Sequence, residues 1–174
     1  MIRFPLAAAV LAAAAPAGAT DLFAGLLAHD IKTPLNLGGY ESGADIELGL
    51  RGPRLHVLDF IGAPSPYAFA SIATDGRTDL VAAGLAWQIG RGRVYLRPGI
   101  GMAIHDRSSH GVRNGFRTDL GSRILFEPEV GLGYRLNPRL AVEASWVHVS
   151  HATLFGPQNP GMDSVGLRLV YRLQ

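Results

Sequence analysis

Apolar and polar residues alternate with a period of two along most of the chain after residue 20. In the segment VYLRPGIGMAI, every second residue from Val94 to Ile104 is apolar, whereas charged, aromatic and small residues occupy the positions between them. The segments ADIELGLR, RILFEPEVGLGYR and SVGLRLVYRL repeat this alternation. Because successive side chains of a strand point to opposite faces, the pattern predicts strands with one apolar face each, and not helices.

The alternating runs predict an all-β chain of eight strands, near residues 21–31, 44–51, 66–74, 79–89, 93–104, 123–135, 139–150 and 162–173. Two folds share this pattern. A soluble sandwich or lipocalin-like barrel turns its apolar face inward, whereas a membrane barrel turns its apolar face outward to lipid. The composition of the polar face decides between them.

The polar face combines many glycines with charged residues of both signs, namely Glu47, Arg97, Glu127, Glu129, Glu143, Arg168 and Arg172. Such residues suit the narrow lumen of an eight-stranded barrel, where opposite charges neutralise each other. The apolar face runs for about ten residues per strand, which is the length that crosses a bilayer when the strand is tilted. We therefore predict an eight-stranded antiparallel transmembrane β-barrel with glutamate–arginine contacts inside. The outer wall is expected to carry Leu96, Leu132, Val142 and Leu167, with Trp146 and Tyr171 in an aromatic girdle.

The first residues, MIRFPLAAAVLAAAAPAGAT, have the organisation of a secretory signal peptide. Arg3 supplies the positive charge, residues 4–15 form the apolar core, and Ala17-Gly18-Ala19 resembles a cleavage site. We expect residues 1–19 to be a signal peptide and residues 20–174 to form the barrel domain of a protein in the outer membrane of a Gram-negative cell.

Composition narrows the classes of partner. The chain has no cysteine and a formal net charge of +2, without a long basic run. The absence of cysteine excludes a disulfide framework and a thiolate metal site, and the small charge argues against nucleic acid as a partner. The sequence contains no constellation of metal ligands and no phosphate-binding loop, so we expect no metal and no cofactor.

The connections between the predicted strands differ in length. If both termini lie in the periplasm, the long connections 32–43, 105–122 and 151–161 lie outside the cell, as outer-membrane barrels usually arrange them. Two connections fit this arrangement less well. TDGR is a short outer loop, and residues 52–65 form a long connection at the inner end.

A base, a hydroxyl and an acid interrupt the apolar face of the last two strands. The outward parity of strand 139–150 continues to His148 and Ser150, and that of strand 162–173 continues backwards to Asp163. Residues two apart on a strand lie roughly 6.6–7 Å apart on one face, so an imidazole can approach the hydroxyl while a neighbouring carboxylate binds its other nitrogen. This is the nucleophile, base and orienting acid of acyl transfer. The alternative is that all three are ordinary rim residues in the headgroup layer, where polar side chains cost little.

The stretch HVSHATLFGPQNPGMDSVGLRLVYRL resembles the C-terminal motif of the PagL family, the lipid A 3-O-deacylases of the outer membrane. The family pattern is His-x-Ser-Asn-Ala-Gly-Leu, then a loop with Asn-Pro-Gly, then an acidic residue and a final strand. The residues that match are His148, Ser150, Ala152, Leu154, Asn159, Pro160, Gly161 and Asp163. The segment GLLAHD, near residues 25–30, extends the likeness more loosely towards the N-terminus.

The resemblance implies an esterase that removes an ester-linked acyl chain, expected at the 3 position, from lipid A of lipopolysaccharide. It implies that Ser150 is the nucleophile, His148 the general base and Asp163 the acid that orients the imidazole. No cofactor is implied, because the reaction involves neither redox nor phosphoryl chemistry. Lipid A and the lipid of the outer membrane are the expected partners, and a homodimer is left open.

The chain departs from the family pattern next to the serine. The family usually has Asn there, whose side chain or neighbouring amides help to hold the oxyanion, whereas this chain has His151. The resemblance therefore gives His151, Ala152 and Gly161 as candidates for binding the oxyanion or the substrate. Thr153, where the family often has Gly, is a second departure.

Two other functions remain compatible with the sequence, a non-enzymatic structural or adhesive barrel and a phospholipase. A second group of Ser and His, in the loop HDRSSHGVRNGFR, has no acid placed to orient its histidine, and we interpret it as a solvated loop. The group consists of Ser108, Ser109 and His110. The same loop contains Arg107, Arg113 and Arg117, which would suit the phosphates of lipopolysaccharide if the loop lies outside the cell.

Overall fold

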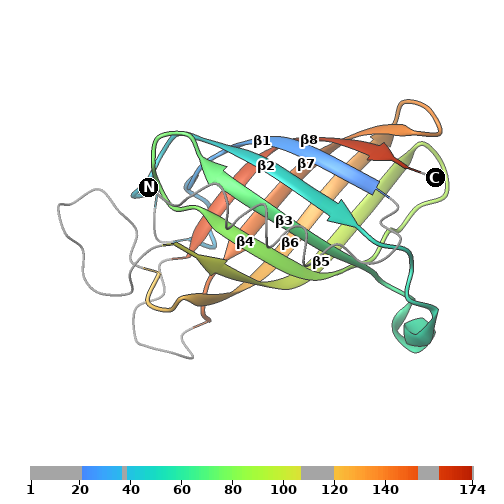
Figure 1. The fold of residues 1–174 in the computed structure, drawn as a ribbon, viewed down its shortest axis with the longest axis horizontal. Coiled ribbons are helices and arrows are strands. Elements are labelled where there is room, and N and C mark those ends of the chain that lie inside the picture. Colours follow the sequence, from blue (N-terminus) through green and yellow to red (C-terminus); the bar gives the residue numbers. More distant parts are fainter. Residues whose placement is uncertain (1–20, 37–38, 107–119, 153–160, 174) are drawn as a thin grey trace.

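The computed structural model describes residues 21–36, 39–106, 120–152 and 161–173. These residues form one closed barrel in which eight antiparallel strands follow each other in chain order (Figure 1). The strands are β1 (Asp21–Ala28), β2 (Ala44–Arg51), β3 (Ser65–Ala73), β4 (Leu80–Ala86), β5 (Val94–His105), β6 (Ile124–Arg135), β7 (Leu140–Val149) and β8 (Met162–Arg172). Pairing of β1 with β8 closes the ring. The predicted fold class, an eight-stranded antiparallel barrel, is confirmed.

Two strands end earlier than the alternation predicts, β1 at Ala28 and β4 at Ala86. After β1, Asp30 adopts a left-handed backbone conformation with a φ of 47°, which turns the chain out of the sheet. After β4, Trp87 stands opposite Pro98 and donates to its carbonyl over 2.9 Å. Because proline has no N–H to return, the ladder is interrupted at this point.

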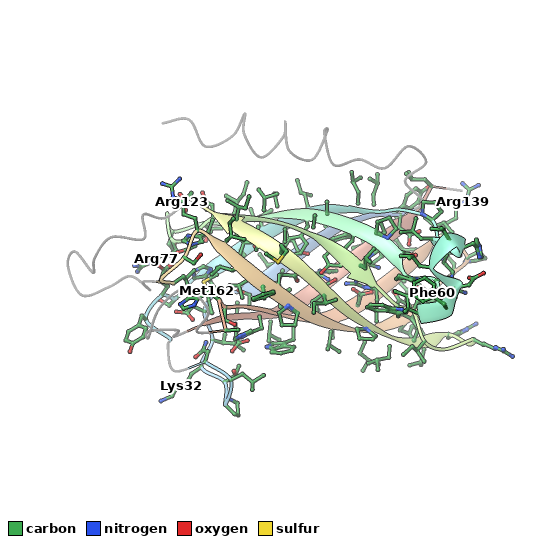
Figure 2. All side chains as sticks on the ribbon, turned by 90° about the horizontal axis from the view of Figure 1, so that it is seen from below. Lys32, Phe60, Arg77, Arg123, Arg139 and Met162 are labelled. Atoms are coloured by element: carbon green, nitrogen blue, oxygen red, sulfur yellow. The ribbon has the colours of Figure 1, made fainter. Side chains whose placement is uncertain are left out.

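The apolar positions of the strands face outward. Leu96, Leu132 and Leu167 are 43%, 55% and 59% exposed, and Val142 is partly exposed on the same wall. Figure 2 shows such side chains standing off the wall along the length of the barrel. The predicted outer wall is confirmed, and so much exposed apolar surface is the surface of a barrel surrounded by lipid.

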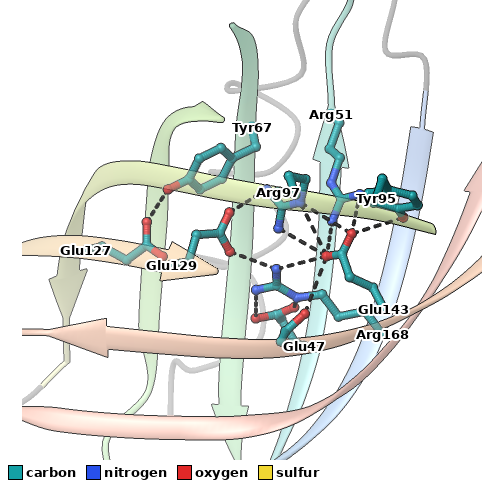
Figure 3. Close-up of polar contacts among 10 residues, drawn as sticks. Glu47, Arg51, Tyr67, Tyr95, Arg97, Glu127, Glu129, Glu143 and Arg168 are labelled. Atoms are coloured by element: carbon teal, nitrogen blue, oxygen red, sulfur yellow. Dashed lines mark hydrogen bonds and ion pairs between the residues drawn. The ribbon is translucent and has the colours of Figure 1, made fainter. Parts of the chain in front are cut away.

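Three arginines meet three glutamates in the middle of the lumen (Figure 3), namely Arg51, Arg97 and Arg168 with Glu47, Glu129 and Glu143. Arg97 and Arg168 donate to Glu129 over 2.6 and 2.7 Å. Glu143 accepts from Arg51 over 2.7 Å and from Arg97 over 3.2 Å. Because these groups are buried, each charge depends on its partners for compensation. The predicted glutamate–arginine contacts are present.

Two charged residues of the polar face depart from that expectation. The partner of Glu127 is the hydroxyl of Tyr67, which donates to it, and in the described part of the chain no arginine bonds to Glu127. Arg97, Arg168 and Arg172 are the alternative partners for the inward glutamates, and of these Arg172 has its guanidinium 3.5 Å from Asp21 and a side chain that is 45% exposed. Arg172 and Asp21 are the last pair in the ladder of β8 and β1. They lie at the open end of the barrel, where the guanidinium is exposed.

The barrel has two unlike ends. We call the end with Asp21 and Arg172 the termini end and the opposite end, with His148, the site end. In Figure 2, Phe60 and Arg139 lie at the termini end, whereas Lys32 lies at the site end.

The connections follow the predicted distribution of lengths. The connections at residues 29–43, 106–123 and 150–161 are long and lie at the site end, where residues 74–79 make a short one. At the termini end, residues 52–64 form the long exception, which contains the 3-10 helix η1 (His56–Ile61). The predicted signal peptide at residues 1–19 lies outside the described residues, as do Ser108, Ser109, His110 and the three arginines of their loop. Within the described residues, no helix has the length and hydropathy needed to cross a membrane.

Candidate active site

His148 and Asp163 face each other across two neighbouring strands at the site end. In the register of β7 and β8 they are direct partners, and His148 Nδ1 donates to Asp163 Oδ1 over 2.9 Å. His148 also stacks on Trp146, with ring centroids 6.0 Å apart, which places both rings on the outer face of β7. A carboxylate that binds Nδ1 fixes the tautomer of the imidazole and turns Nε2 away from the acid.

Two further donors hold the Asp163 carboxylate. Trp146 Nε1 donates to Oδ1 over 2.8 Å, and the Thr33 hydroxyl donates to Oδ2. The side chain of Asp163 is 0% exposed. With donors from β7 and from the β1–β2 connection, the carboxylate is fixed in position before any substrate arrives.

The β1–β2 connection covers the start of β8. Ile31 N–H donates to the Asp163 carbonyl over 2.8 Å, next to the contact of Thr33. Within the connection, Asp30 accepts from the Glu41 N–H over 2.8 Å, which helps to fix the loop. The strand parity predicted for the histidine and acid is present, but the acid is covered by this loop and does not face lipid. The side chain of His148 is 11% exposed.

Ser150 follows β7 and continues its register with β6. Its N–H donates to the Phe126 carbonyl over 3.1 Å, and its carbonyl accepts from the Phe126 N–H over 2.7 Å. The serine therefore shares the outward parity of His148, two residues further along the strand. In the described part of the chain, no hydrogen bond joins the Ser150 hydroxyl to His148. The structure brings base and acid into contact and leaves the hydroxyl adjacent but unengaged with the base.

The backbone on both sides of the β7–β8 connection is unusual. Ala152 has a φ of 50°, which costs free energy for a residue with a side chain, and Gly161 has a φ of 66°. A Cβ at Gly161 would lie 2.8 Å from His148 Cε1, so only glycine lets the backbone pass this close to the imidazole. His151 is 0% exposed. These are the three residues that the sequence offered as oxyanion or substrate contacts.

Another buried histidine, His29, lies at the same end of the barrel and binds two carboxylates. His29 binds Asp45 Oδ1 through Nδ1 over 2.7 Å and Glu41 Oε2 through Nε2 over 2.9 Å. Burial alone would lower the pKa of His29, but hydrogen bonds to Asp45 and Glu41 and their charges outweigh it and raise the pKa to about 9. Ser164 donates to Asp45 over 3.1 Å and Thr78 N–H donates to Glu41 over 2.9 Å. The cluster thus ties the β1–β2 connection to β8 and to the residues before β4.

Sequence reasoning missed two residues of this site. Trp146 was assigned to an aromatic girdle, yet its indole binds Asp163. Thr33 is 130 residues from Asp163 in the chain, and no local pattern marks it. Its only signal is that it lies in one of the long connections. In the described ranges, no group of three or more His, Asp or Glu side chains is arranged to hold a metal ion.

Comparisons with known proteins agree with the motif. The family model "Lipid A 3-O-deacylase (PagL)" matches residues 65–172. The protein named lipid A deacylase PagL of Bordetella bronchiseptica (strain ATCC BAA-588 / NCTC 13252 / RB50) is 31% identical over 86 residues. The aligned stretch is 49% of this chain and 44% of that relative, so the chain matches less than half of the relative's length.

Two solved structures share the barrel. The crystal structure of the outer membrane enzyme PagL superposes with a TM-score of 0.61 at 20% identity, covering 87% of this chain and 98% of that one. The backbone structure of the Yersinia pestis outer membrane protein Ail in a phospholipid bilayer nanodisc gives a TM-score of 0.51 at 13% identity, covering 90% and 99%. At these identities the likeness is one of fold.

Proposed function

The chain belongs to the lipid A 3-O-deacylase (PagL) family, and from this premise we propose that it is an outer-membrane esterase that hydrolyses the ester of an acyl chain at the 3 position of lipid A. The observation that carries the proposal is the hydrogen bond between His148 and Asp163 on the outer wall, two residues from Ser150. A buried carboxylate costs free energy unless donors hold it, and here the donors of Asp163 include an imidazole beside a serine, which is the arrangement of a base and its orienting acid.

In the proposed mechanism Ser150 is the nucleophile and His148 the general base. Asp163 binds Nδ1, so Nε2 is the nitrogen that takes the proton of the serine hydroxyl. The hydroxyl turns towards Nε2 when substrate binds, since catalytic hydrogen bonds are often long or absent before the substrate complex forms. The serine oxygen then attacks the ester carbonyl and forms a tetrahedral oxyanion.

The second half of the reaction returns the enzyme to its starting state. The C–O bond to the sugar breaks, and the sugar hydroxyl leaves with the proton held by His148. The acyl chain is then an ester of Ser150. Water, deprotonated by the same imidazole, attacks the carbonyl of that ester. The bond between the acyl carbon and the Ser150 oxygen breaks, the serine oxygen takes the proton back from His148, and the fatty acid is released. The sequence of steps uses no metal, oxidant or cofactor.

We assign the oxyanion to backbone amides of the turn after Ser150 and near Gly161. Preorganised N–H groups are effective at a developing negative charge, and the left-handed backbone of Ala152 turns the chain two residues after the serine. The imidazole of His151 is a weaker candidate because the residue is fully buried and substrate has no access to it. If backbone amides bind the oxyanion, the reaction does not require the Asn side chain that the family usually has at this position.

We place the site end of the barrel outside the cell and the termini end in the periplasm. The long connections gather at the site end, as they do at the outer face of such barrels. This orientation sets His148 and Ser150 beside the outer leaflet, where lipid A resides. Export to that membrane requires the proposed signal peptide of residues 1–19.

Mass spectrometry of lipid A from cells with and without the protein tests the function. Expression should produce lipid A that lacks one acyl chain, and Ser150→Ala should restore the full mass. Activity should fall by about four orders of magnitude or more in that variant. Heat-dependent gel mobility should show that the variant still folds, because the serine's structural bonds are made by its backbone.

The alternatives give different results in the same assays. An inert barrel leaves lipid A unchanged at every level of expression. A phospholipase leaves lipid A unchanged and releases fatty acid from phosphatidylglycerol vesicles. Full deacylation by Ser150→Ala would exclude the serine mechanism.

A further inference from the structure

The β2–β3 connection at the termini end is a built element. Leu55 N–H donates to the Pro64 carbonyl over 2.9 Å, and Arg54 donates to the carbonyls of Ala63 and Gly62 over 3.1 and 3.0 Å. These bonds close residues 52–64 into a compact unit around η1. In Figure 1, the short coil of η1 stands off the barrel at the termini end, on the same side as the C-terminus.

The short helix η1 has one apolar face that is exposed to solvent. Val57 and Phe60 lie on either side of Leu58, where the backbone kinks out of the helical region, and each is 81% exposed. His56 and Asp59 form the neighbouring polar pair, 3.4 Å apart and also exposed. A large apolar pair held in the open by an ordered scaffold marks a contact surface.

This apolar face is continuous with the outer wall of the barrel. The Trp87 indole donates to the Ile61 carbonyl over 2.7 Å, and its ring lies against Gly62. Two residues further on, Ile89 is 58% exposed and pairs with Leu96 of the wall. Tryptophan is enriched where a membrane protein meets the headgroup layer. The apolar face of η1 therefore extends the lipid-facing surface sideways at the height of Trp87.

We infer that η1 is a membrane-contact segment with phospholipid as its partner. Its Val57 and Phe60 side chains lie at the boundary between headgroups and acyl chains in the leaflet at the termini end. His56 and Asp59 then face water, as the polar side of an interfacial helix does. The inference rests on the proposed function only in so far as the barrel spans a bilayer, and it does not depend on catalysis. It accounts for the one long connection at an end where short turns are usual.

Site-directed fluorescence tests this membrane contact. Because the chain has no native cysteine, a dye can be attached at one chosen position. Phe60→Cys, with Asp59→Cys as the matched control on the polar face, is labelled with an environment-sensitive dye. Each protein is placed in nanodiscs of phosphatidylethanolamine and phosphatidylglycerol, in which both faces are open to water. The label at position 60 should shift to the blue, be quenched by lipids spin-labelled near the headgroup, and lose most of its quenching by iodide. The label at position 59 should show the reverse.

Equal quenching of the two labels by iodide would overturn the inference. So would a lipid-like signal at position 60 that disappears when labelled protein is diluted, because the partner would then be a second copy of the chain. Leu132→Cys, on the outer wall, separates this result from failure of the membrane barrel. If the label at position 132 is not quenched by spin-labelled lipid, the barrel does not span the bilayer, and the proposed function fails with it. Deacylation by Val57→Ser/Phe60→Ser in detergent micelles should equal that of the wild type, because both residues lie at the end opposite His148.

Discussion

The hydroxyl of Thr33 binds the carboxylate of Asp163 across 130 residues of sequence, so a loop between the first two strands fixes an acid at the start of the last one. Asp163 receives three side-chain donors, from Thr33, Trp146 and His148. Only the contact with His148 belongs to the catalytic triad that we propose. The other two hold the acid so that it can orient the imidazole, which makes Thr33 and Trp146 positioning residues.

Thr33→Val should slow deacylation about tenfold, because a hydrogen bond to a charged group contributes about 1.5–3 kcal/mol, of which part orients His148. The value of kcat should fall while KM stays near that of the wild type, since the Thr33 hydroxyl is engaged with Asp163. Thr33→Ser keeps the hydroxyl and should retain most of the activity. A parallel loss in both variants, or a rise in KM alone, would contradict a positioning role.

Gly161→Ala should displace the imidazole of His148. The added Cβ would stand 2.8 Å from Cε1, and the φ of 66° disfavours any residue with a side chain. We expect loss of at least about 90% of the activity, since small misplacement of a catalytic group is costly in rate. Thermal unfolding should show only a modest change, of about 1 kcal/mol. Gly92→Ala is the matched control, because a Cβ there meets nothing within 4 Å, and this variant should behave as wild type.

The charge network of the lumen predicts a strong effect at one arginine of β8 and a weak effect at another. Arg168→Met leaves Glu47 and Glu129 buried without a shared cation and should destabilise the barrel by about 3–5 kcal/mol. Arg172→Met removes a half-exposed partner 3.5 Å from Asp21 and should cost about 1 kcal/mol or less. Urea unfolding from micelles measures both changes. Equal changes in the free energy of unfolding would mean that a buried arginine contributes no more to stability than an exposed one.

The period of two was sufficient to predict the barrel and the side of the wall on which each strand residue stands. It placed Leu132 outside and Glu129 inside, because parity is a local property of the strand. The same reasoning put His148 opposite Asp163, since the two strands are joined by one connection and pair in sequence order.

The partners of these residues were not predictable in the same way. The contact of Thr33 with Asp163 depends on how a long connection folds back over the rim, and no periodicity encodes that path. Glu127 shows the same limit inside the lumen, where the phenol of Tyr67 and not an arginine is its partner. Alternation assigns a face, whereas the choice of partner on that face depends on shear and side-chain length.

The His29 cluster predicts a loss of stability at alkaline pH. The folded-state pKa of about 9 lies above the ordinary value of 6.5, so protonation of His29 favours the folded state. The contribution is complete below about pH 6.5, where the unfolded chain is protonated too, and it is lost as pH rises through about 9. The difference between the two pKa values corresponds to about 3 kcal/mol of folding stability at most.

His29→Gln should therefore unfold at a lower urea concentration than wild type at about pH 6, and the gap between the two unfolding midpoints should narrow towards about pH 10. His56→Gln is the control, because His56 is exposed and, among the residues that the structure describes, its carboxylate contact is Asp59 at 3.4 Å. That variant should follow the wild type at every pH. A gap for His29→Gln that stays constant or widens with rising pH would show that the histidine is not held as a cation between Asp45 and Glu41.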